Sequence, residues 1–290
     1  MLTPTPLGQR TADPPLFPDP TVLDTVLYAY LRRADRMGWS PYDLVTHDKV
    51  RQLARVDRLS PEQRSAVLTV LYVEDHLPGY MAEYLRHMTG PELADAQHIV
   101  NRQALHFVFR WAAEEDRHAH VLEMYLTRTG LMTRAALDAD LLRERKTEYH
   151  FPYDCLVESF IYLALQEKAT HLYYRALAQD IDEPLLKVLL RHMANDEASH
   201  AKFFYDLLLK CQQGDLRALA KKVVAVARDF RMPVQTNLTN YRVQILGLMR
   251  AAPAYRHADV LANLQQALER AVAGREPEAL SLVTPEGVQI

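Results

Sequence analysis

Glycine is scarce in this chain of 290 residues, which contains only nine. Strand-like alternation of apolar and polar residues is also rare. Apolar residues instead recur at steps of three and four, the spacing of one face of an α-helix. The sequence therefore disfavours a fold built from strands and tight turns, and it predicts an all-α fold.

The sequence also has few cysteines, a small net charge and no long apolar run. The two cysteines, Cys155 and Cys211, argue against a disulfide framework and favour a reducing compartment. A net charge of −3 gives no global basic field for binding nucleic acid or an anionic membrane. No window approaches the roughly 18 to 20 apolar residues that a membrane helix needs. We therefore expect a cytoplasmic protein without membrane insertion and without a nucleic-acid partner.

Proline is concentrated at the N-terminus, where residues 1–20 hold six of the sixteen prolines. This segment lacks the apolar run of a signal peptide. We expect residues 1–20 to form a flexible Pro-rich arm and residues 21–275 a single domain. The tail, residues 276–290, is expected to be loosely ordered.

Start and stop signals place the helices. Ser60-Pro61-Glu62-Gln63 predicts a capping box, Gly130 predicts a helix end, and Pro78 predicts a bend in the helix that contains it. The segment GWSPYDLVTHDK is expected to be irregular. The expected helices cover about 21–37, 60–87, 91–129, 133–148, 153–180, 183–211, 215–231, 239–250 and 258–273. The long second, third, fifth and sixth suit a four-helix bundle with the others flanking it.

Charged residues interrupt the apolar stripes of these four long helices. In WAAEEDRHAHVLEMY, residues 111–125, the stripe passes through Glu115 and His118. An unpaired ionised carboxylate in an apolar interior costs several kcal/mol or more. The stripes of the other three helices hold Glu74, Glu167, and the pair Glu197 and His200. Each of these buried carboxylates needs a compensating charge.

The order of these residues is duplicated: a lone glutamate followed by Glu-x-x-His, twice. The separations are 41 residues, from 74 to 115, and 30 residues, from 167 to 197. Residues three apart share a helix face, so each pair can ligate one ion, and two pairs with two single glutamates make a dinuclear carboxylate site. Two divalent cations would neutralise four carboxylates. Mixed carboxylate and imidazole ligands favour iron or manganese over structural zinc, and we choose iron because it also supplies oxygen chemistry.

Five segments resemble the soluble acyl-acyl-carrier-protein desaturases of plant plastids and actinobacteria. The similarity covers about residues 39 to 210 and lies in WSPYD (39–43), VEDHLPGY (73–80), EEDRH (114–118), QEKAT (166–170) and DEASH (196–200). The resemblance implies a ferritin-like bundle in which two irons activate O₂. It also implies that a carrier-bound acyl chain is desaturated with electrons from a ferredoxin-type donor, in a homodimer.

The resemblance also implies roles for individual residues. The iron ligands would be Glu74, Glu115, His118, Glu167, Glu197 and His200. Two further residues would take part in catalysis: Thr170, close to the oxygen-binding side, and Asp196, a partner of a ligand histidine, with His118 as the candidate and Trp39 beyond it. Second-sphere carboxylates of this kind orient ligand imidazoles.

His171 departs from the family, which has phenylalanine at this position. It is one turn beyond Glu167, so it is an additional candidate ligand, a hydrogen-bond donor to a ligand, or a core histidine bonded to a helix carbonyl. Ligation would move the chemistry toward oxygen insertion. Glu114, Asp116 and His120 fall off the stripe, and we expect most of them to be solvated or paired on the bundle surface.

Two other functions stay open from the sequence. One is a di-iron oxygenase, a hydroxylase or N-oxygenase, that acts on a carrier-bound or free substrate. The other is a ferritin-like metal-binding protein without turnover, which we consider the weaker alternative because about 80 residues follow the last bundle helix.

Overall fold

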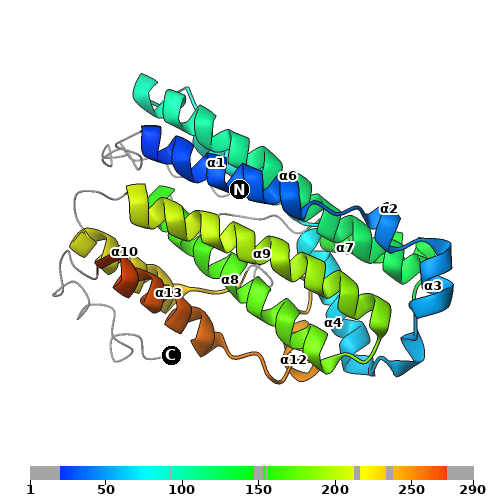
Figure 1. Cartoon of the computed structure of the whole chain (residues 1–290). Helices are drawn as coiled ribbons and strands as arrows, with labels where there is room; N and C mark the ends of the chain where they lie inside the picture. Colours follow the sequence, from blue (N-terminus) through cyan, green and yellow to red (C-terminus); the bar gives the residue numbers. More distant parts are fainter. Residues whose placement is uncertain are drawn as a thin grey trace, which may run out of the picture.

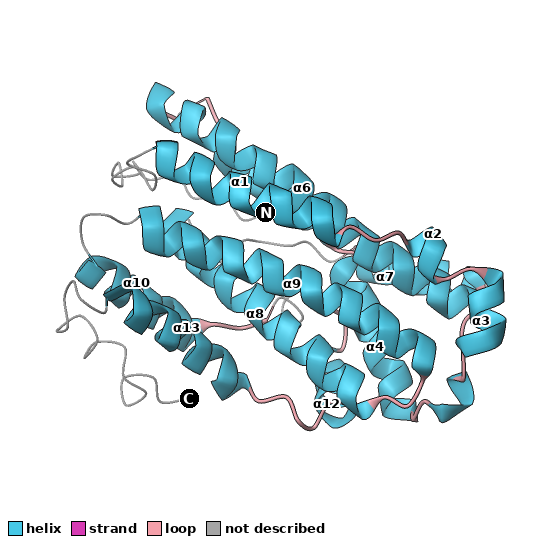
Figure 2. Ribbon diagram, viewed as in Figure 1, coloured by secondary structure: helices cyan, strands magenta, loops and turns pink. Residues whose placement is uncertain are grey.

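A computed structural model describes residues 20–91, 93–146, 153, 156–211, 216–232 and 238–272. Within these ranges all regular secondary structure is helical (Figure 2), and the expected all-α fold is confirmed. The predicted tail, 276–290, lies outside the described residues, as does the predicted arm apart from Pro20, the first residue of α1.

Four helices form the bundle (Figure 1): α4 (Pro61–Glu74), α6 (Asp95–Arg128), α8 (Leu156–Asp180) and α9 (Pro184–Cys211). α8 and α9 pack against each other as a hairpin, while α6 contacts both α4 and α9. α1 (Pro20–Met37) lies over α6 and α9. The helices around them are α5 (Leu77–Met88), α7 (Arg134–Glu144), α10 (Leu216–Asp229), α12 (Tyr241–Ala251) and α13 (His257–Val272). The four-helix bundle with flanking helices is thus present.

The predicted start signal of α4 and the predicted end signal of α6 are both confirmed. Oγ of Ser60 accepts from the backbone N–H of Gln63 at 3.2 Å, and Oε1 of Gln63 accepts from the N–H of Ser60 at 3.0 Å. Gly130 follows α6 with φ 75°, a left-handed conformation that glycine adopts without steric cost.

The helix expected over 60–87 is broken rather than bent. α4 ends at Glu74 and α5 begins at Leu77. Pro78 has no N–H to donate to the carbonyl four residues earlier, which belongs to Glu74, and its ring crowds that carbonyl. Glu74 therefore occupies the last position of α4.

The segment expected to be irregular contains two short helices, α2 (Pro41–Leu44) and α3 (His47–Leu53). Pro41 is in the first turn of α2, and Oγ1 of Thr46 caps α3 by accepting from the N–H of Lys49 at 3.1 Å. Both are ordinary helix-start features. The expectation was wrong because these helices are too short to show apolar periodicity.

Two buried apolar clusters fill the described part of the bundle, one toward each end. On α6 the first cluster reaches Trp111 and the second begins at Ala119. On α8 the change falls between Ala169 and Tyr174, and on α9 between Ala194 and Phe203. The interrupted stretches lie at the same level of the bundle, so a polar layer separates the two clusters.

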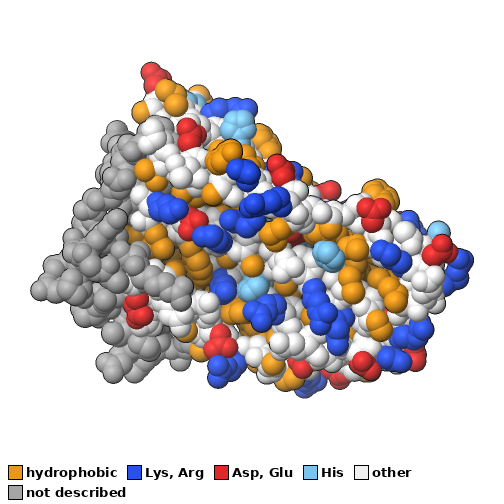
Figure 3. All heavy atoms as spheres, viewed as in Figure 1, with side chains coloured by type: hydrophobic (Ala, Val, Ile, Leu, Met, Phe, Trp, Pro, Cys, Tyr) orange, Lys and Arg blue, Asp and Glu red, His pale blue; other side chains and the backbone are white. Residues whose placement is uncertain are grey.

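The surface of the molecule is of mixed polar and apolar character. None of the helices in the described ranges has an apolar stretch long enough to cross a membrane. On the face shown in Figure 3, charged and hydrophobic side chains are interspersed, and Lys and Arg side chains lie along α1 and α9.

Candidate metal centre

The polar layer brings together all six residues that the sequence singled out as ligands. Each is at most 8% exposed. Their ligand atoms fall into two groups, and within each group the atoms lie within 4.8 Å of one another. The first group is Glu74, Glu115, His118 and Glu197, and the second is Glu115, Glu167, Glu197 and His200. Glu115 and Glu197 belong to both groups.

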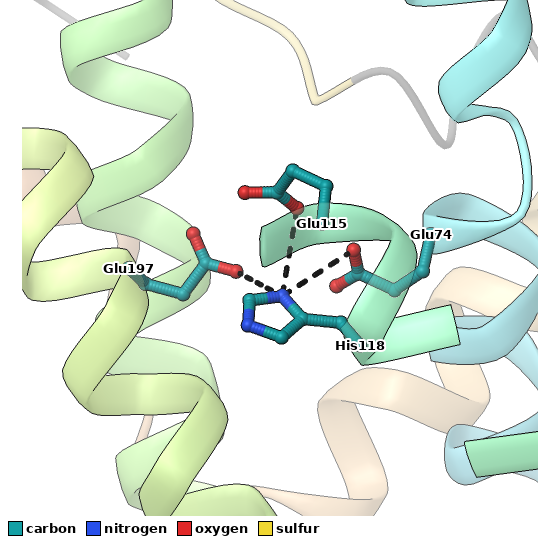
Figure 4. A group of neighbouring side chains, drawn as sticks. All are labelled: Glu74, Glu115, His118 and Glu197. Atoms are coloured by element: carbon teal, nitrogen blue, oxygen red, sulfur yellow. Dashed lines mark ion pairs between the residues drawn. The ribbon is translucent and has the colours of Figure 1, made fainter. Parts of the chain in front are cut away.

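The two shared glutamates each present one oxygen to each histidine (Figure 4 shows the first group). Nδ1 of His118 lies 3.5 Å from Oε2 of Glu115 and 3.3 Å from Oε1 of Glu197. Nδ1 of His200 lies 2.9 Å from Oε1 of Glu115 and 3.7 Å from Oε2 of Glu197. A carboxylate placed in this way can bridge two metal ions.

The two lone glutamates complete one group each. Oε2 of Glu74 lies 3.8 Å from Nδ1 of His118, and Oε2 of Glu167 lies 3.2 Å from Nδ1 of His200. The four helices thus supply two similar sets, each with one lone glutamate and one histidine, around the shared pair. This is the ligand arrangement of ferritin-like dinuclear carboxylate bundles.

Unsatisfied atoms inside the cluster show that it fits metal ions. Nδ1 of His118 and Oε1 of Glu197 are buried and have no hydrogen-bond partner, although they lie 3.3 Å apart. Buried polar atoms without a partner are uncommon in folded proteins. Four carboxylates and two imidazoles are a donor set suited to iron or manganese, and two divalent ions would balance the four negative charges.

Without cations, the cluster must hold protons instead. Burial raises the pKa of Glu74 to about 8, and the charge of Glu115 adds to this shift. Burial also raises the pKa of Glu167, together with the charges of Glu197 and Glu115. Burial alone would lower the pKa of His118, but its hydrogen bond to Asp196 and the negative charge of Glu115 raise it well above its ordinary value. Metal binding must therefore displace protons.

Asp196 lies where the sequence placed it, between His118 and Trp39. Its Oδ2 accepts from Nε2 of His118 at 3.1 Å, from Nε1 of Trp39 at 2.8 Å and from Nη2 of Arg117 at 2.7 Å. Because Nε2 of His118 is engaged in this way, Nδ1 is the nitrogen that faces the cluster.

Glu114 is a functional residue that the sequence reasoning missed, and the expectation of a surface position was wrong for it. It is buried, and its Oε2 lies 2.9 Å from Nε2 of His200. The hydroxyl of Tyr30 donates to the same oxygen at 2.7 Å, and Nε of Arg110 donates to Oε1 at 3.0 Å. Asp116, in contrast, is exposed as expected.

A sequence signal for Glu114 did exist. Glu114 precedes Glu115 as Asp196 precedes Glu197, so the duplicated motif is an acidic residue followed by Glu-x-x-His. A residue one position earlier is rotated by about 100° on the helix, so it leaves the stripe of its own helix. It then faces the neighbouring helix, where the histidine of the other half lies.

His171 takes the third of its three alternatives. Its Nδ1 donates to the backbone carbonyl of Ala194 at 2.7 Å, and it belongs to neither ligand group. Burial lowers its pKa, which favours the neutral form of the ring. It is a core histidine bonded to α9.

Thr170 borders a small pocket whose wall includes Glu74, Glu115, Glu167 and Glu197. Its hydroxyl donates to the carbonyl of Gln166 at 3.0 Å. A second small pocket is lined mainly by apolar and aromatic side chains, among them Phe107, Phe160, Leu163 and Phe204. Trp111 contributes to the walls of both pockets.

Two curated proteins are similar to this chain in sequence. A putative acyl-[acyl-carrier-protein] desaturase of Mycobacterium tuberculosis is 27% identical over 182 residues, 60% of this chain and 62% of the relative. The chloroplastic stearoyl-[acyl-carrier-protein] 9-desaturase 1 of Arabidopsis thaliana is 26% identical over 268 residues, 82% of this chain and 64% of the relative. The chain thus spans about three fifths of the length of these relatives.

Solved structures and a family model also match this chain. An R2-like ligand-binding oxidase with an aerobically reconstituted metal cofactor covers 90% of each chain at 14% identity, with a TM-score of 0.49. Residues 23–264 match the family described as fatty acid desaturase. This match includes both ligand groups and the two residues, Asp196 and Glu114, that hold their histidines. The chain belongs to the fatty acid desaturase family.

Proposed function

We propose that this protein is an O₂-dependent di-iron enzyme that introduces a C=C bond into an acyl chain tethered to acyl carrier protein. The observation that carries the proposal is the pair of ligand groups that share Glu115 and Glu197. It supports a dinuclear centre, and membership of the family supports the acyl substrate.

In this proposal the six buried side chains divide into three pairs. Glu74 and His118 would hold one iron, Glu167 and His200 would hold the other, and Glu115 and Glu197 would contribute to both. Bound iron supplies the O₂-derived oxidising power for removing hydrogen from an unactivated C–H bond, which acid and base side chains cannot do. Asp196 and Glu114 fix the two imidazoles, and the apolar clusters on either side exclude water.

The linings of the two small pockets indicate where we place the substrate. We assign the apolar pocket to hydrocarbon and the pocket beside the carboxylates to the reacting part of the chain, with Trp111 between them. Thr170, on the wall of the pocket beside the carboxylates, is our candidate for a hydroxyl group on the oxygen-binding side.

The proposed electron donor is a ferredoxin-type protein, and the proposed assembly is a homodimer. Trp39 is half-buried and is joined to His118 by hydrogen bonds through Asp196, so we place the donor's approach at this indole. Figure 3 shows arginine and lysine side chains along α1 and α9. The exposed basic residues of these two helices include Arg32, Arg36, Arg191 and Lys202. Exposed basic residues of this kind suit acidic partners.

The decisive experiment is intact-carrier mass spectrometry. Iron-loaded, reduced protein is incubated with oxygen and a panel of acyl carriers, and we expect one carrier to lose two hydrogens. Glu115→Gln should abolish the change, while Asp116→Asn, the exposed neighbour, should retain it. Purified protein that takes up fewer than about two irons per chain would contradict the proposal, as would unchanged masses across the panel.

A second candidate function, oxygen insertion, is favoured by two unpaired polar atoms on residues that line the pocket beside the carboxylates. Nε1 of Trp111 and Oε1 of Gln166 belong to residues of its wall, and both are buried without a hydrogen-bond partner. They suit a substrate with a polar group, which a plain hydrocarbon lacks. The same mass measurement separates the two functions, because insertion adds one oxygen to the substrate.

A further inference from the structure

The two halves of the candidate metal centre differ at their lone glutamates. Glu167 lies in the middle of α8, whereas Glu74 is the last residue of α4. A residue at a helix end is held by fewer backbone hydrogen bonds than one in the middle. Glu74 therefore needs support from its side-chain contacts if it is to bind a metal in one fixed position.

Tyr174 supplies this support. It lies on α8, is 2% exposed, and its hydroxyl donates to Oε1 of Glu74. The other oxygen, Oε2, is the one that lies 3.8 Å from Nδ1 of His118. In the other half, no described residue donates a hydrogen bond to Oε1 of Glu167.

The two histidines differ in the same direction. Nδ1 of His118 makes no hydrogen bond, so it has a proton to release but no hydrogen bond to exchange when it binds a metal. Nδ1 of His200 is hydrogen-bonded to Oε2 of Glu167 at 3.2 Å, and a metal must replace that bond. Preorganised ligands bind more tightly because less has to be rearranged on binding.

We propose that Tyr174 is a positioning residue that makes the two metal positions unequal. By engaging Oε1 it restricts Glu74 to ligation through Oε2, and the position formed with His118 fills first. The position formed with His200 fills second and keeps a glutamate, Glu167, that is free to change how it binds. This inference rests on the dinuclear centre of the proposed function.

The test compares two neighbouring tyrosines by anaerobic calorimetric titration of the full-length, metal-free protein with Fe²⁺. For the unsubstituted protein we expect two binding steps of different affinity. Tyr174→Phe should weaken the first step on the order of tenfold, as expected for the loss of one hydrogen bond to a carboxylate, and leave the second unchanged. Tyr173→Phe is the matched control, because the hydroxyl of Tyr173 donates to the carbonyl of Leu248 at 3.1 Å and should affect neither step.

A measurement on the unsubstituted protein serves as an independent check. Crystals loaded with one Mn²⁺ per chain should show anomalous density at the His118 position. Equal occupancy of both positions, or a preference for the His200 position, overturns the inference. So does a Tyr174→Phe protein whose two binding steps both match those of the unsubstituted protein, or are both weakened equally.

The outcomes separate this inference from the proposed function. A protein that binds no metal overturns both. A protein that binds two metals in unequal steps but leaves every acyl carrier unchanged overturns only the proposed activity and supports the role of Tyr174.

Discussion

At the scale of single residues, the candidate centre is held by acids that are not ligands. Asp196 lies beside Glu197 in the second half but bonds His118 of the first, and Glu114 lies beside Glu115 in the first half but approaches His200 of the second. Each half therefore orients the imidazole of the other. This cross-pairing fixes which nitrogen of each histidine faces the cluster.

Replacing either of these acids by its amide should weaken metal binding. We expect Asp196→Asn and Glu114→Gln each to lower the affinity for Fe²⁺ by about 10-fold to 100-fold, the usual effect of removing a carboxylate that supports a ligand histidine. Competition with a chelator of known affinity measures the change. Asp116→Asn, an exposed change, should have no effect. Unaltered affinity in Glu114→Gln would assign Glu114 to packing alone.

His171→Phe should leave the metal centre unchanged. Because Nδ1 of His171 is bonded to the carbonyl of Ala194, we expect two metals per chain and the same absorption spectrum as the unsubstituted protein. The loss of this buried hydrogen bond should reduce the free energy of unfolding by about 1 kcal/mol. Loss of one metal would instead restore His171 as a ligand.

At the scale of elements, one proline shapes the first half of the bundle. Pro78 interrupts the helix so that Glu74 ends α4, while the other lone glutamate stays in the middle of an uninterrupted α8. The duplicated motif is thus built on helices that are not equivalent. Because Glu74 ends its helix, we propose that its side chain depends on the contact with Tyr174.

The capping box at the start of α4 should be worth a measurable part of the stability. Ser60→Ala removes the side-chain acceptor for the N–H of Gln63, and we expect a loss of about 1 kcal/mol in the free energy of unfolding. Urea denaturation of the metal-free protein measures it. Ser40→Ala is the control, since Ser40 precedes α2 without a side-chain cap bond. Equal losses in the two variants would show that the cap contributes nothing specific.

At the scale of the whole molecule, a charged layer is enclosed between two apolar clusters. Folding buries four candidate ligand carboxylates and two imidazoles together, and protons or cations must balance them. The layer therefore links the stability of the fold to pH and to metal. At this level all four bundle helices contribute polar side chains to a single site.

The metal-free protein should become less stable as pH rises from about 4.3 to about 8, most steeply above about 6.5, where His118 adds to the effect of Glu74. Burial raises the folded-state pKa of Glu74 to about 8, compared with about 4.3 for an unfolded glutamate, so the folded state holds the extra proton between these values. His118, whose folded-state pKa is raised, also holds its proton above the unfolded value of about 6.5. For both groups, the free energy of unfolding falls as pH rises from the unfolded-state pKa to the folded-state pKa.

Thermal unfolding at a series of pH values tests this expectation. The melting temperature of the metal-free protein should fall between about pH 6.5 and pH 8.5, by roughly 2 to 4 °C for each kcal/mol lost. With two metals bound the slope should be much smaller, because the cations have replaced the protons. Parallel curves with and without metal would show that the layer is not the source of the pH dependence.

Much of the fold and most of the candidate centre could be predicted from local sequence patterns. Apolar periodicity located the long helices, and the stripe positions selected Glu115 over Glu114 as a ligand candidate. Short helices such as α3 were not predicted because they span too few residues to show apolar periodicity. Before α5 a bend was predicted where the helix is in fact broken. The domain extent, 21–275, stays a prediction, although Leu23 and Leu264 lie in one apolar cluster.

The sequence by itself determined which side chains lie on the buried face of each helix, because that face follows from a fixed rotation per residue. It thereby determined the two sets of candidate ligands. Only the tertiary structure decided which groups meet across helices: Glu114 with His200, Tyr174 with Glu74, and His171 with a backbone carbonyl of α9. These pairings depend on the packing and rotation of neighbouring helices, which no pattern within a single helix contains.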